Sequence, residues 1–311
     1  MIEDSIGVDL SKAHLDAFRP SDGASARFAN GPAGFRAFRR WLGAACPARV
    51  VYEPTGPYHA AFEARFAGEL PLVKVNPLQA RRFAEAKGVR AKTDRVDARM
   101  LAGMGAAFAL EPDRPVSQTG RDLKELHGER RALVAQAGDL RTRLKTLALP
   151  LTRTLVRRRL ALVLRQLAAL DGEIARLIAA DAALARNHRI LCSIPGIGAV
   201  SAAAVLTHLP EIGTMERKAC ASLAGLAPMT RMSGQWQGKA HIGGGRKPLR
   251  DALYMPALVA IRHNPGLRAA YEALRGRGKP AKLALVAVMR ALLETANALV
   301  RANRIWTPMP P

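Results

Sequence analysis

The chain has 311 residues, which is long enough for two or three domains with cores of their own, and 49% of them are hydrophobic, which excludes a disordered chain. It carries 48 Lys and Arg against 25 Asp and Glu, a formal net charge of +23. This excess favours a polyanionic partner, with nucleic acid ahead of a membrane surface. The cationic residues are spread along the chain, and no apolar run is expected to span a bilayer.

The three cysteines, Cys46, Cys192 and Cys220, are widely separated. Their odd number and spacing exclude a disulfide framework and a zinc site. We therefore expect three small, buried, reduced side chains in a cytoplasmic protein. The first five residues lack the basic start of a signal peptide, which agrees with that location.

The first third of the chain alternates between strand and helix patterns. The predicted strands are 5–10, 14–19, 26–29, 49–53 and 72–75, and helices are expected to begin near Pro32, Tyr58, Pro77 and Asp94. Three strands followed by alternating helices and strands are typical of the ribonuclease-H-like fold, in which the first strand is central and a parallel neighbour follows the first helix. We predict such a mixed-sheet domain over residues 1–112.

Four carboxylates in this region could form one site. Asp9 lies on the first strand, Glu53 ends the fourth, and Asp94 and Asp97 stand three residues apart on one face of a helix start. The carboxyl ends of strands are where sites form in open sheets. Hard oxygen ligands suit Mg²⁺ or Mn²⁺, and two such ions would serve phosphoryl transfer. The alternative is a solvated first helical turn, favoured by the helix dipole, and an ordinary loop glutamate.

The middle of the chain has leucine-rich heptad patterns on both sides of Pro150. A change of composition at 112–115 predicts a linker before them. The patterns comprise Leu126, Leu133, Ala137, Leu140, Leu144, Leu147 and Leu151, and then Leu160, Val163, Leu167, Leu170, Ile174 and Leu177. Over residues 113–186 they predict a helical hairpin or a coiled coil, and we favour a dimerising coiled coil over a purely intramolecular hairpin.

The last region, 187–311, is predicted to be mostly helical. The turn at 194–198, with Gly196 and Gly198, is similar to a helix-hairpin-helix, whose glycines let backbone N–H groups approach a phosphate; a simple helical hairpin turn is the alternative. Ser233 lies in a glycine- and arginine-rich segment without an evident activating histidine or aspartate, so spacing alone favours an ordinary loop serine. Residues 306–311 are predicted to be a disordered end.

Several cations and glycines are candidates for contact with a nucleic-acid backbone. The candidates are Lys92, Arg95, Arg157, Arg158, Arg159, Gly196, Gly198, Arg231, Lys239, Arg246, Lys247 and Arg250. The run 157–159 is equally compatible with a solvated surface.

Together these motifs resemble one family, the DEDD-type insertion-sequence transposases, which are bridge-RNA-guided recombinases. The resemblance lies in 6–9 (Ile-Gly-Val-Asp), 52–56 (Tyr-Glu-Pro-Thr-Gly), 92–98 (Lys-Thr-Asp-Arg-Val-Asp-Ala), 194–198 (Ile-Pro-Gly-Ile-Gly), and 225–228 (Gly-Leu-Ala-Pro) followed by Ser233 and Gly234. It implies a RuvC-like N-terminal domain whose metal-binding carboxylates are Asp9, Glu53, Asp94 and Asp97. It also implies a coiled-coil middle and a C-terminal domain in which Ser233 becomes linked to DNA.

The resemblance further implies double-stranded DNA and a noncoding guide RNA as partners, and a homodimer or homotetramer. The preferred hypothesis is therefore a Mg²⁺-dependent transposase or recombinase with a serine–DNA intermediate. One alternative is a RuvC-like, structure-selective endonuclease that uses metal-activated water. A second is a nucleic-acid-binding protein without catalytic activity.

Overall fold

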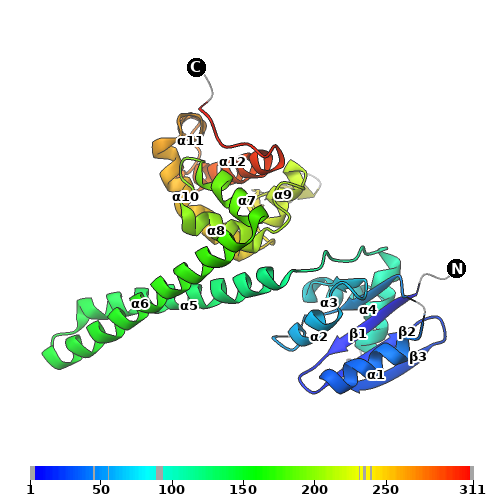
Figure 1. Cartoon of the computed structure of the whole chain (residues 1–311). Coiled ribbons are helices and arrows are strands. Elements are labelled where there is room, and N and C mark those ends of the chain that lie inside the picture. Colours follow the sequence, from blue (N-terminus) through cyan, green and yellow to red (C-terminus); the bar gives the residue numbers. More distant parts are fainter. Residues whose placement is uncertain are drawn as a thin grey trace. The chain divides into compact units, whose positions relative to one another are not determined.

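In the computed structural model the chain forms two compact units, Met1–Val116 and Ser117–Pro311 (Figure 1). The structure describes residues 4–44, 46–54, 56–88, 94–230, 232–233, 236–238 and 240–308, and at 94, 95, 232, 236 and 237 it describes the backbone. The finer division of the chain at residues 112 and 186 stays a prediction.

The N-terminal unit is an α/β domain built on one mixed sheet. Its elements are β1 (Ser5–Leu10), β2 (His14–Arg19), β3 (Ala24–Ala29), α1 (Pro32–Leu42), β4 (Arg49–Tyr52), α2 (Ala60–Phe66), β5 (Leu72–Lys74), α3 (Pro77–Ala86) and α4 (Asp94–Ala107). The strand order is β3-β2-β1-β4-β5. Strands β1, β2 and β3 pair antiparallel, whereas β4 is parallel to both β1 and β5. The central position of β1 and its parallel neighbour are as predicted.

Helices cover both faces of this sheet because its strands alternate apolar side chains between them. One face packs on α1 and α2, where Phe35, Phe38, Phe62 and Phe66 form a cluster of edge-to-face and tilted rings. The other face packs on α3 and α4 through a second core that includes Val51. Local signals start the helices as well: the Asn76 side chain accepts a hydrogen bond from the Leu78 amide at the start of α3.

The C-terminal unit is mainly helical, and its described residues include four short strands. Its elements are α5 (Gln118–Thr146), α6 (Pro150–Ala180), α7 (Ala182–Cys192), α8 (Ala199–His208), α9 (Arg217–Leu223), β6 (Pro228–Met229), β7 (Met232–Ser233), β8 (Trp236–Gln237), β9 (His241–Ile242), α10 (Lys247–His263), α11 (Pro265–Gly276) and α12 (Ala281–Arg301). The prediction of a mostly helical region holds, but the segment expected to be a glycine-rich loop contains all four strands.

Helices α5 and α6 lie side by side as an antiparallel hairpin within one chain (Figure 1). The predicted heptad positions form its seam: Leu133, Ala137, Leu140 and Val163 are buried there, together with Val156. Leu151, which was also predicted to lie in the seam, is 71% exposed. The apolar stripe that we assigned to a dimer interface is thus covered by the chain's own second helix, and dimerisation through that stripe loses its support.

The core of the C-terminal unit is built around α12, which packs against α7, α9, α10 and α11. On length and composition alone α12 is long and apolar enough to cross a membrane, which the sequence analysis did not anticipate. More than half of its most apolar stretch is buried inside the unit, however, as expected for a core helix.

Three further expectations need correction. Cys46 and Cys192 are exposed, and only Cys220 of the three cysteines is buried. Trp306 does not belong to a disordered end, because its side chain packs against the helical core and its backbone N–H donates to the Ser193 hydroxyl over 2.8 Å.

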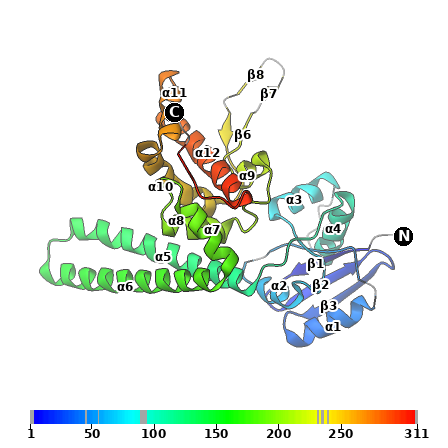
Figure 2. The same cartoon turned by 45° about the horizontal axis from the view of Figure 1, so that its top comes forward.

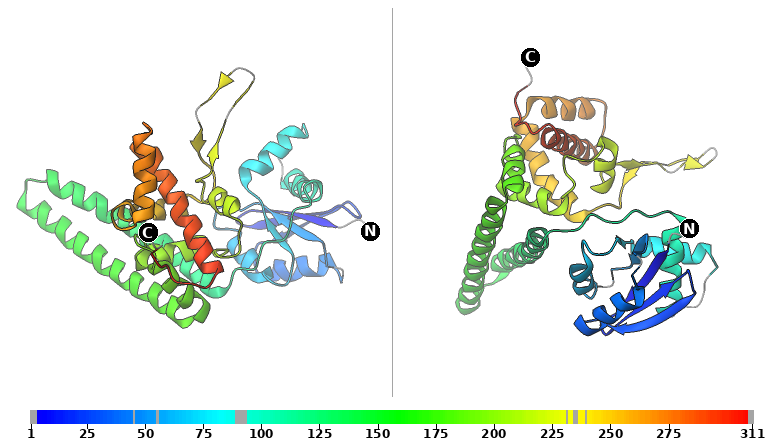
Figure 3. Two further views of the ribbon diagram at one scale, coloured as in Figure 1. Left: turned by 90° about the horizontal axis from the view of Figure 1, so that it is seen from above. Right: turned by 45° about the vertical axis from the view of Figure 1, so that its right-hand side comes forward.

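The segment from β6 to β9 forms a β-ribbon. Strand β6 pairs with β9, and β7 pairs with β8, both antiparallel. Figures 2 and 3 show this ribbon projecting from the helices of its own unit. Ser233 lies in β7, the more distant pair of strands along the ribbon, and is exposed.

Candidate active site

The parallel pairing of β1 with β4 brings two of the predicted carboxylates to one edge of the sheet. The register pairs Val8 with Tyr52, and Asp9 and Glu53 are the next residue on each strand. Val8 and Tyr52 are buried against α1 and α2, so the alternation along each strand turns Asp9 and Glu53 towards the opposite face, which α4 covers. Both carboxylates are half-buried.

Helix α4 lies directly on β1, and a glycine permits the contact. A Cβ atom on Gly7 would lie 1.9 Å from the Ala98 carbonyl oxygen and 2.5 Å from the Ala102 nitrogen. Further along, a Cβ on Gly105 would lie 2.4 Å from the Ser5 hydroxyl. Ser5, at the start of β1, thus lies near Gly105, whereas Gly7, further along β1, lies near Ala98, which comes earlier in α4. Helix and strand are therefore antiparallel.

This direction places the first turn of α4 at the carboxyl end of β1, where Asp9 lies. Asp97 immediately precedes Ala98 and is half-buried. The backbone therefore brings the segments that carry Asp9, Glu53 and Asp97 to one edge of the sheet, and the side chain of Asp94 lies outside the described residues. Among the described side chains, no group of three or more His, Cys, Asp or Glu is arranged to hold a metal ion.

Asn30, which the sequence analysis missed, joins the loops that follow the two strand carboxylates. Its side-chain amide donates to the Ser11 carbonyl over 2.8 Å and to the Tyr58 carbonyl over 3.0 Å. Ser11 follows Asp9 by two residues, and Tyr58 lies in the segment between Glu53 and α2. An asparagine before a glycine and a proline gives no sequence signal for this bridge, because the bridge depends on chain folding over long separations.

A polar network involving β5 and α2 also contacts the segment between Glu53 and α2. The Lys74 ammonium lies 2.5 Å from the Glu63 carboxylate, His59 Nε2 lies 3.6 Å from it, and the other ring nitrogen of His59 contacts the Gly56 carbonyl over 2.9 Å. Burial alone would raise the pKa of Glu63, but the hydrogen bond and charge of Lys74 hold it below its ordinary value. Burial, reinforced by Glu63, raises the pKa of Tyr52 well above its ordinary value, so its hydroxyl stays protonated.

Replacing Asn30 by alanine is expected to lower the free energy of unfolding of the N-terminal unit by about 1–3 kcal/mol, because two carbonyl acceptors lose their donor. DNA cleavage should fall further than this loss of stability explains, since the loops after Asp9 and Glu53 are no longer joined. Asn76→Ala is the control, because it removes a helix cap of similar worth at α3. Urea unfolding and cleavage rates of both variants check this; equal loss of cleavage in the two would contradict it.

The two glycines of the predicted helix-hairpin-helix have different roles. Gly196 has a φ of +110°, and a Cβ there would lie 2.6 Å from the Pro256 carbonyl oxygen, so it permits close packing on α10. Gly198 is the N-cap residue of α8, and a Cβ atom there would meet nothing within 4 Å. The start of α8 is thus exposed, and a phosphate contact at Gly198 stays a prediction.

The predicted cations fall into three groups. Lys92, Arg231 and Lys239, and the side chain of Arg95, lie outside the described residues. Arg157, Arg158 and Arg159 are exposed on α6. Arg246, Lys247 and Arg250 form the third group, whose side chains have partners within the chain.

Arg246 donates two hydrogen bonds to the Glu211 carboxylate, each over 2.7 Å. Arg250 donates to the Gly244 carbonyl over 2.9 Å, and Lys247 forms an ion pair with Asp251. These bonds tie the ribbon and the start of α10 to the helices, which gives Arg246 and Arg250 a structural role that the sequence analysis did not foresee. Their contact with a nucleic acid stays a prediction.

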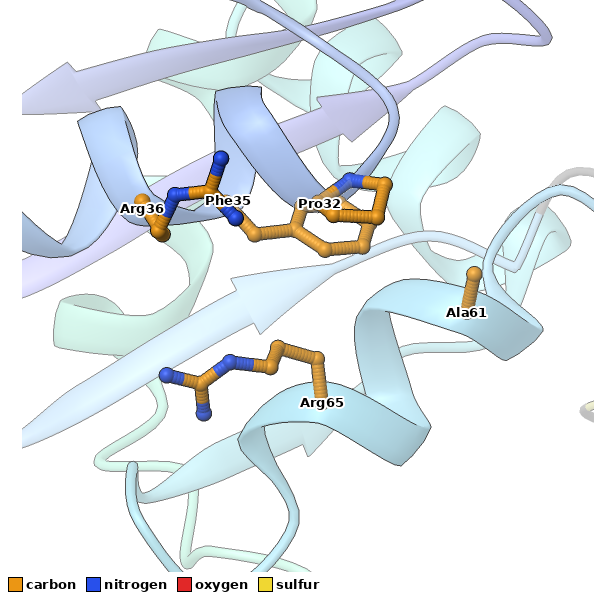
Figure 4. Close-up of a pocket in the computed structure, with 5 residues that line it drawn as sticks. All are labelled: Pro32, Phe35, Arg36, Ala61 and Arg65. Carbon is orange, nitrogen blue, oxygen red and sulfur yellow. The ribbon is translucent and has the colours of Figure 1, made fainter.

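An open pocket of about 440 Å³ lies between α1 and α2, lined by Pro32, Phe35, Arg36, Ala61 and Arg65 (Figure 4). These helices cover the face of the sheet opposite to α4. The pocket is therefore separate from the edge to which the segments carrying Asp9, Glu53 and Asp97 are brought.

Two family profiles match the chain. A transposase profile of the DEDD type found in IS110 elements matches residues 6–151, and one described as the transposase IS116/IS110/IS902 family matches residues 188–272. The chain belongs to the IS110 family of transposases. As a member of this family it is a DNA transposase or recombinase of the insertion-sequence type.

Relatives of this IS110-family transposase include proteins that match it over nearly their whole length. The pilin gene-inverting proteins of Moraxella bovis and Moraxella lacunata are each 29% identical over 96% of this chain and 96% of their own. An uncharacterized 42 kDa protein of the insertion element IS900 from Mycobacterium paratuberculosis is 33% identical over 46% of this chain and 38% of its own.

Proposed function

We propose that this transposase cuts and rejoins DNA through attack of the Ser233 hydroxyl on a phosphodiester, with Asp9, Glu53, Asp94 and Asp97 as metal ligands. The observation that supports it most is the meeting of β1, β4 and the first turn of α4 at one edge of the sheet. A carboxylate-bearing residue belongs to each of the three segments. The position of Ser233 on a projecting ribbon adds support, because it leaves the hydroxyl accessible to a large substrate.

The carboxylates fit a divalent cation by their chemistry. Carboxylate oxygens are the ligands that Mg²⁺ and Mn²⁺ prefer, and the half-buried positions of Asp9, Glu53 and Asp97 leave one side open to substrate. When bound, two such ions would neutralise charge on both the attacking and the leaving oxygen.

The reaction exchanges one phosphodiester linkage for another, so the number of such linkages stays the same. A bond forms between the Ser233 oxygen and phosphorus, the bond from phosphorus to one strand breaks, and the departing oxygen takes a proton to become a free hydroxyl. The proton of the serine hydroxyl passes to solvent. Attack of a strand hydroxyl on the phosphoserine reverses these steps and releases the serine, so strands can be exchanged without an external energy source.

We further propose that a noncoding RNA pairs with the DNA and supplies the sequence recognition, whereas the protein holds the backbones. The formal charge of +23 and the exposed arginines 157–159 support this arrangement. The carboxylates and Ser233 belong to different units of the chain. A homodimer or homotetramer in which the carboxylates of one subunit meet Ser233 of another is therefore part of the proposal.

The test is to incubate the protein with Mg²⁺, the RNA from its element and end-labelled DNA, and to look for a protein–DNA adduct that survives denaturation. We expect the adduct with the unmodified protein and none with Ser233→Ala. Ser222→Ala, at an exposed serine of α9 in the same unit, is the matched control and should form the adduct normally.

The other outcomes identify the alternatives. If the protein were an endonuclease that uses water, the Ser233→Ala variant would still cut DNA. Neither the variant nor the unmodified protein would form an adduct. A binding protein would shift the labelled DNA in a gel without cutting it. Either result would overturn the serine mechanism.

A further inference from the structure

Four cationic side chains gather where α11 ends and α12 begins, at two helices that lie next to one another in the C-terminal unit (Figure 1). They are Arg275, Arg277, Lys279 and Lys282, and all four are exposed. We call this surface the α11–α12 corner. The sequence has no acidic residue between 273 and 293, so no carboxylate close in sequence follows these cations to offset their positive charge.

The corner is held in one conformation. The Gly278 N–H donates to the Arg275 carbonyl over 2.9 Å, and the Lys279 N–H donates to the Leu274 carbonyl over 3.1 Å, which closes the end of α11. Helix α12 then runs directly into the helical core, where Leu285 and Val288 are buried. The backbone that carries the four cations is therefore ordered at the end of α11 and the start of α12.

Within the described part of the chain, the hydrogen bonds of the corner's cations go to neutral acceptors. The side chains of Arg275 and Arg277 donate to the carbonyls of Lys279 and Ala273, which are neutral acceptors. Among the described residues, none of the four cations forms an ion pair with a carboxylate. This contrasts with Arg246, which is paired with Glu211 in the same unit.

The backbone at the corner is accessible as well. A Cβ atom on Gly276 or on Gly278 would meet nothing within 4 Å, so the turn presents open space between the cations. The turn between the cations is therefore open to solvent, and a polyanion can reach its main chain.

We infer that the α11–α12 corner binds the sugar–phosphate backbone of duplex DNA without reading its sequence. The inference rests on the proposed function for its substrate and names a contact surface that the proposed chemistry does not use. Exposed cations grouped along residues 275–282 suit the closely spaced phosphates of a duplex, and each neutralised phosphate releases counterions.

Other polyanions fit the corner less well. Single-stranded nucleic acid is bound by stacking on aromatic rings, and in the described residues 265–300 Tyr271 is the one aromatic residue and packs against the core. A membrane surface needs an exposed apolar face, whereas Leu283 is the one large exposed hydrophobic residue of that range.

The test measures duplex binding over a range of salt concentrations. The double variant Lys279→Gln/Lys282→Gln removes two charges whose ammonium groups hold no hydrogen bond among those described. We expect the dissociation constant for a short duplex of arbitrary sequence to rise about tenfold, and the slope of its logarithm against the logarithm of salt concentration to fall by about two. Fluorescence anisotropy between about 50 and 200 mM salt measures both.

The matched control is Arg81→Gln/Arg176→Gln, which removes two exposed charges that are paired with Glu85 and Glu173. It should bind with nearly the original affinity and slope. Loss of binding by the control to the same extent, or an unchanged slope in the corner variant, would overturn the inference. So would a loss confined to single-stranded RNA or to vesicles of anionic lipid.

This measurement needs neither cleavage nor an adduct, so it is independent of the serine mechanism. A corner variant with unaltered binding, in a protein that forms the Ser233 adduct, overturns the inference and leaves the proposed function in place. Loss of binding and slope in a protein that forms no adduct supports the corner and overturns the serine mechanism. Exposed charges contribute little to stability, and thermal unfolding should be unchanged.

Discussion

Replacing Gly7 by alanine is expected to disrupt the N-terminal unit. The new Cβ would lie 1.9 Å from the Ala98 carbonyl oxygen and 2.5 Å from the Ala102 nitrogen, and both are backbone atoms of α4. A side chain can rotate away from such a clash, but a helix backbone can only move as a whole. We expect a loss of about 3 kcal/mol in the free energy of unfolding, the upper end of the cost of overpacking, and displacement of α4 from β1.

The displacement should abolish DNA cleavage even in the molecules that remain folded, because α4 carries Asp97. Gly31→Ser is the control: its φ of −175° is extended, a Cβ there meets nothing within 4 Å, and serine is a good helix N-cap. Urea unfolding and hydrogen exchange of α4 peptides measure both effects. A stable Gly7→Ala protein with α4 protected as before would show that the close contact is absent in solution.

The packing of α4 on Gly7 is the part of the site that could not be predicted from the sequence. Short apolar runs were sufficient to place β1 and β4, with Asp9 on the first and Glu53 at the end of the second, because such runs are a local property. The predicted strand 5–10 and the observed β1 agree. Which helix would cross β1, and at which residue, depends on contacts between segments about 90 residues apart, and no local pattern records it.

The heptads show the same limit in the middle of the chain. The spacing correctly identified the apolar positions of α5 and α6, such as Leu140 and Val163. A heptad pattern requires an apolar partner but does not say whether the partner is the same chain or a second copy. The three-residue connection between α5 and α6 favours the intramolecular pairing, and in the sequence its end was marked by Pro150, the first residue of α6.

The ribbon was missed for a different reason. Its strands are two residues each, too short for a periodic pattern, and glycines lie within the ribbon and directly after it. The cations in and after the ribbon were assigned to phosphate contact from their charge and the flexible glycine-rich backbone, although Arg246 is paired with Glu211, 35 residues away. The number of charged residues is known from the sequence, but their pairing with carboxylates far along the chain is seen only in the folded structure.

Removal of a single predicted metal-ligating carboxylate is expected to have the largest effect on activity. Asp9→Asn, Glu53→Gln and Asp97→Asn each keep the size of the side chain and remove a negative charge at the edge formed by β1, β4 and α4. We expect each to slow strand cleavage by roughly a thousandfold, equivalent to about 4 kcal/mol of lost transition-state stabilisation. Binding of duplex DNA should be retained or strengthened, because a negative charge near the phosphates is lost.

Glu85→Gln is the matched control, since Glu85 is an exposed carboxylate of α3 in the same unit, paired with Arg81. It should cleave DNA at the original rate. Single-turnover cleavage and DNA binding, measured on all four variants, separate loss of chemistry from loss of substrate. Full cleavage activity in Asp97→Asn would mean that the first turn of α4 lies near β1 for packing alone, because a metal ligand cannot be exchanged for an amide without cost to the reaction.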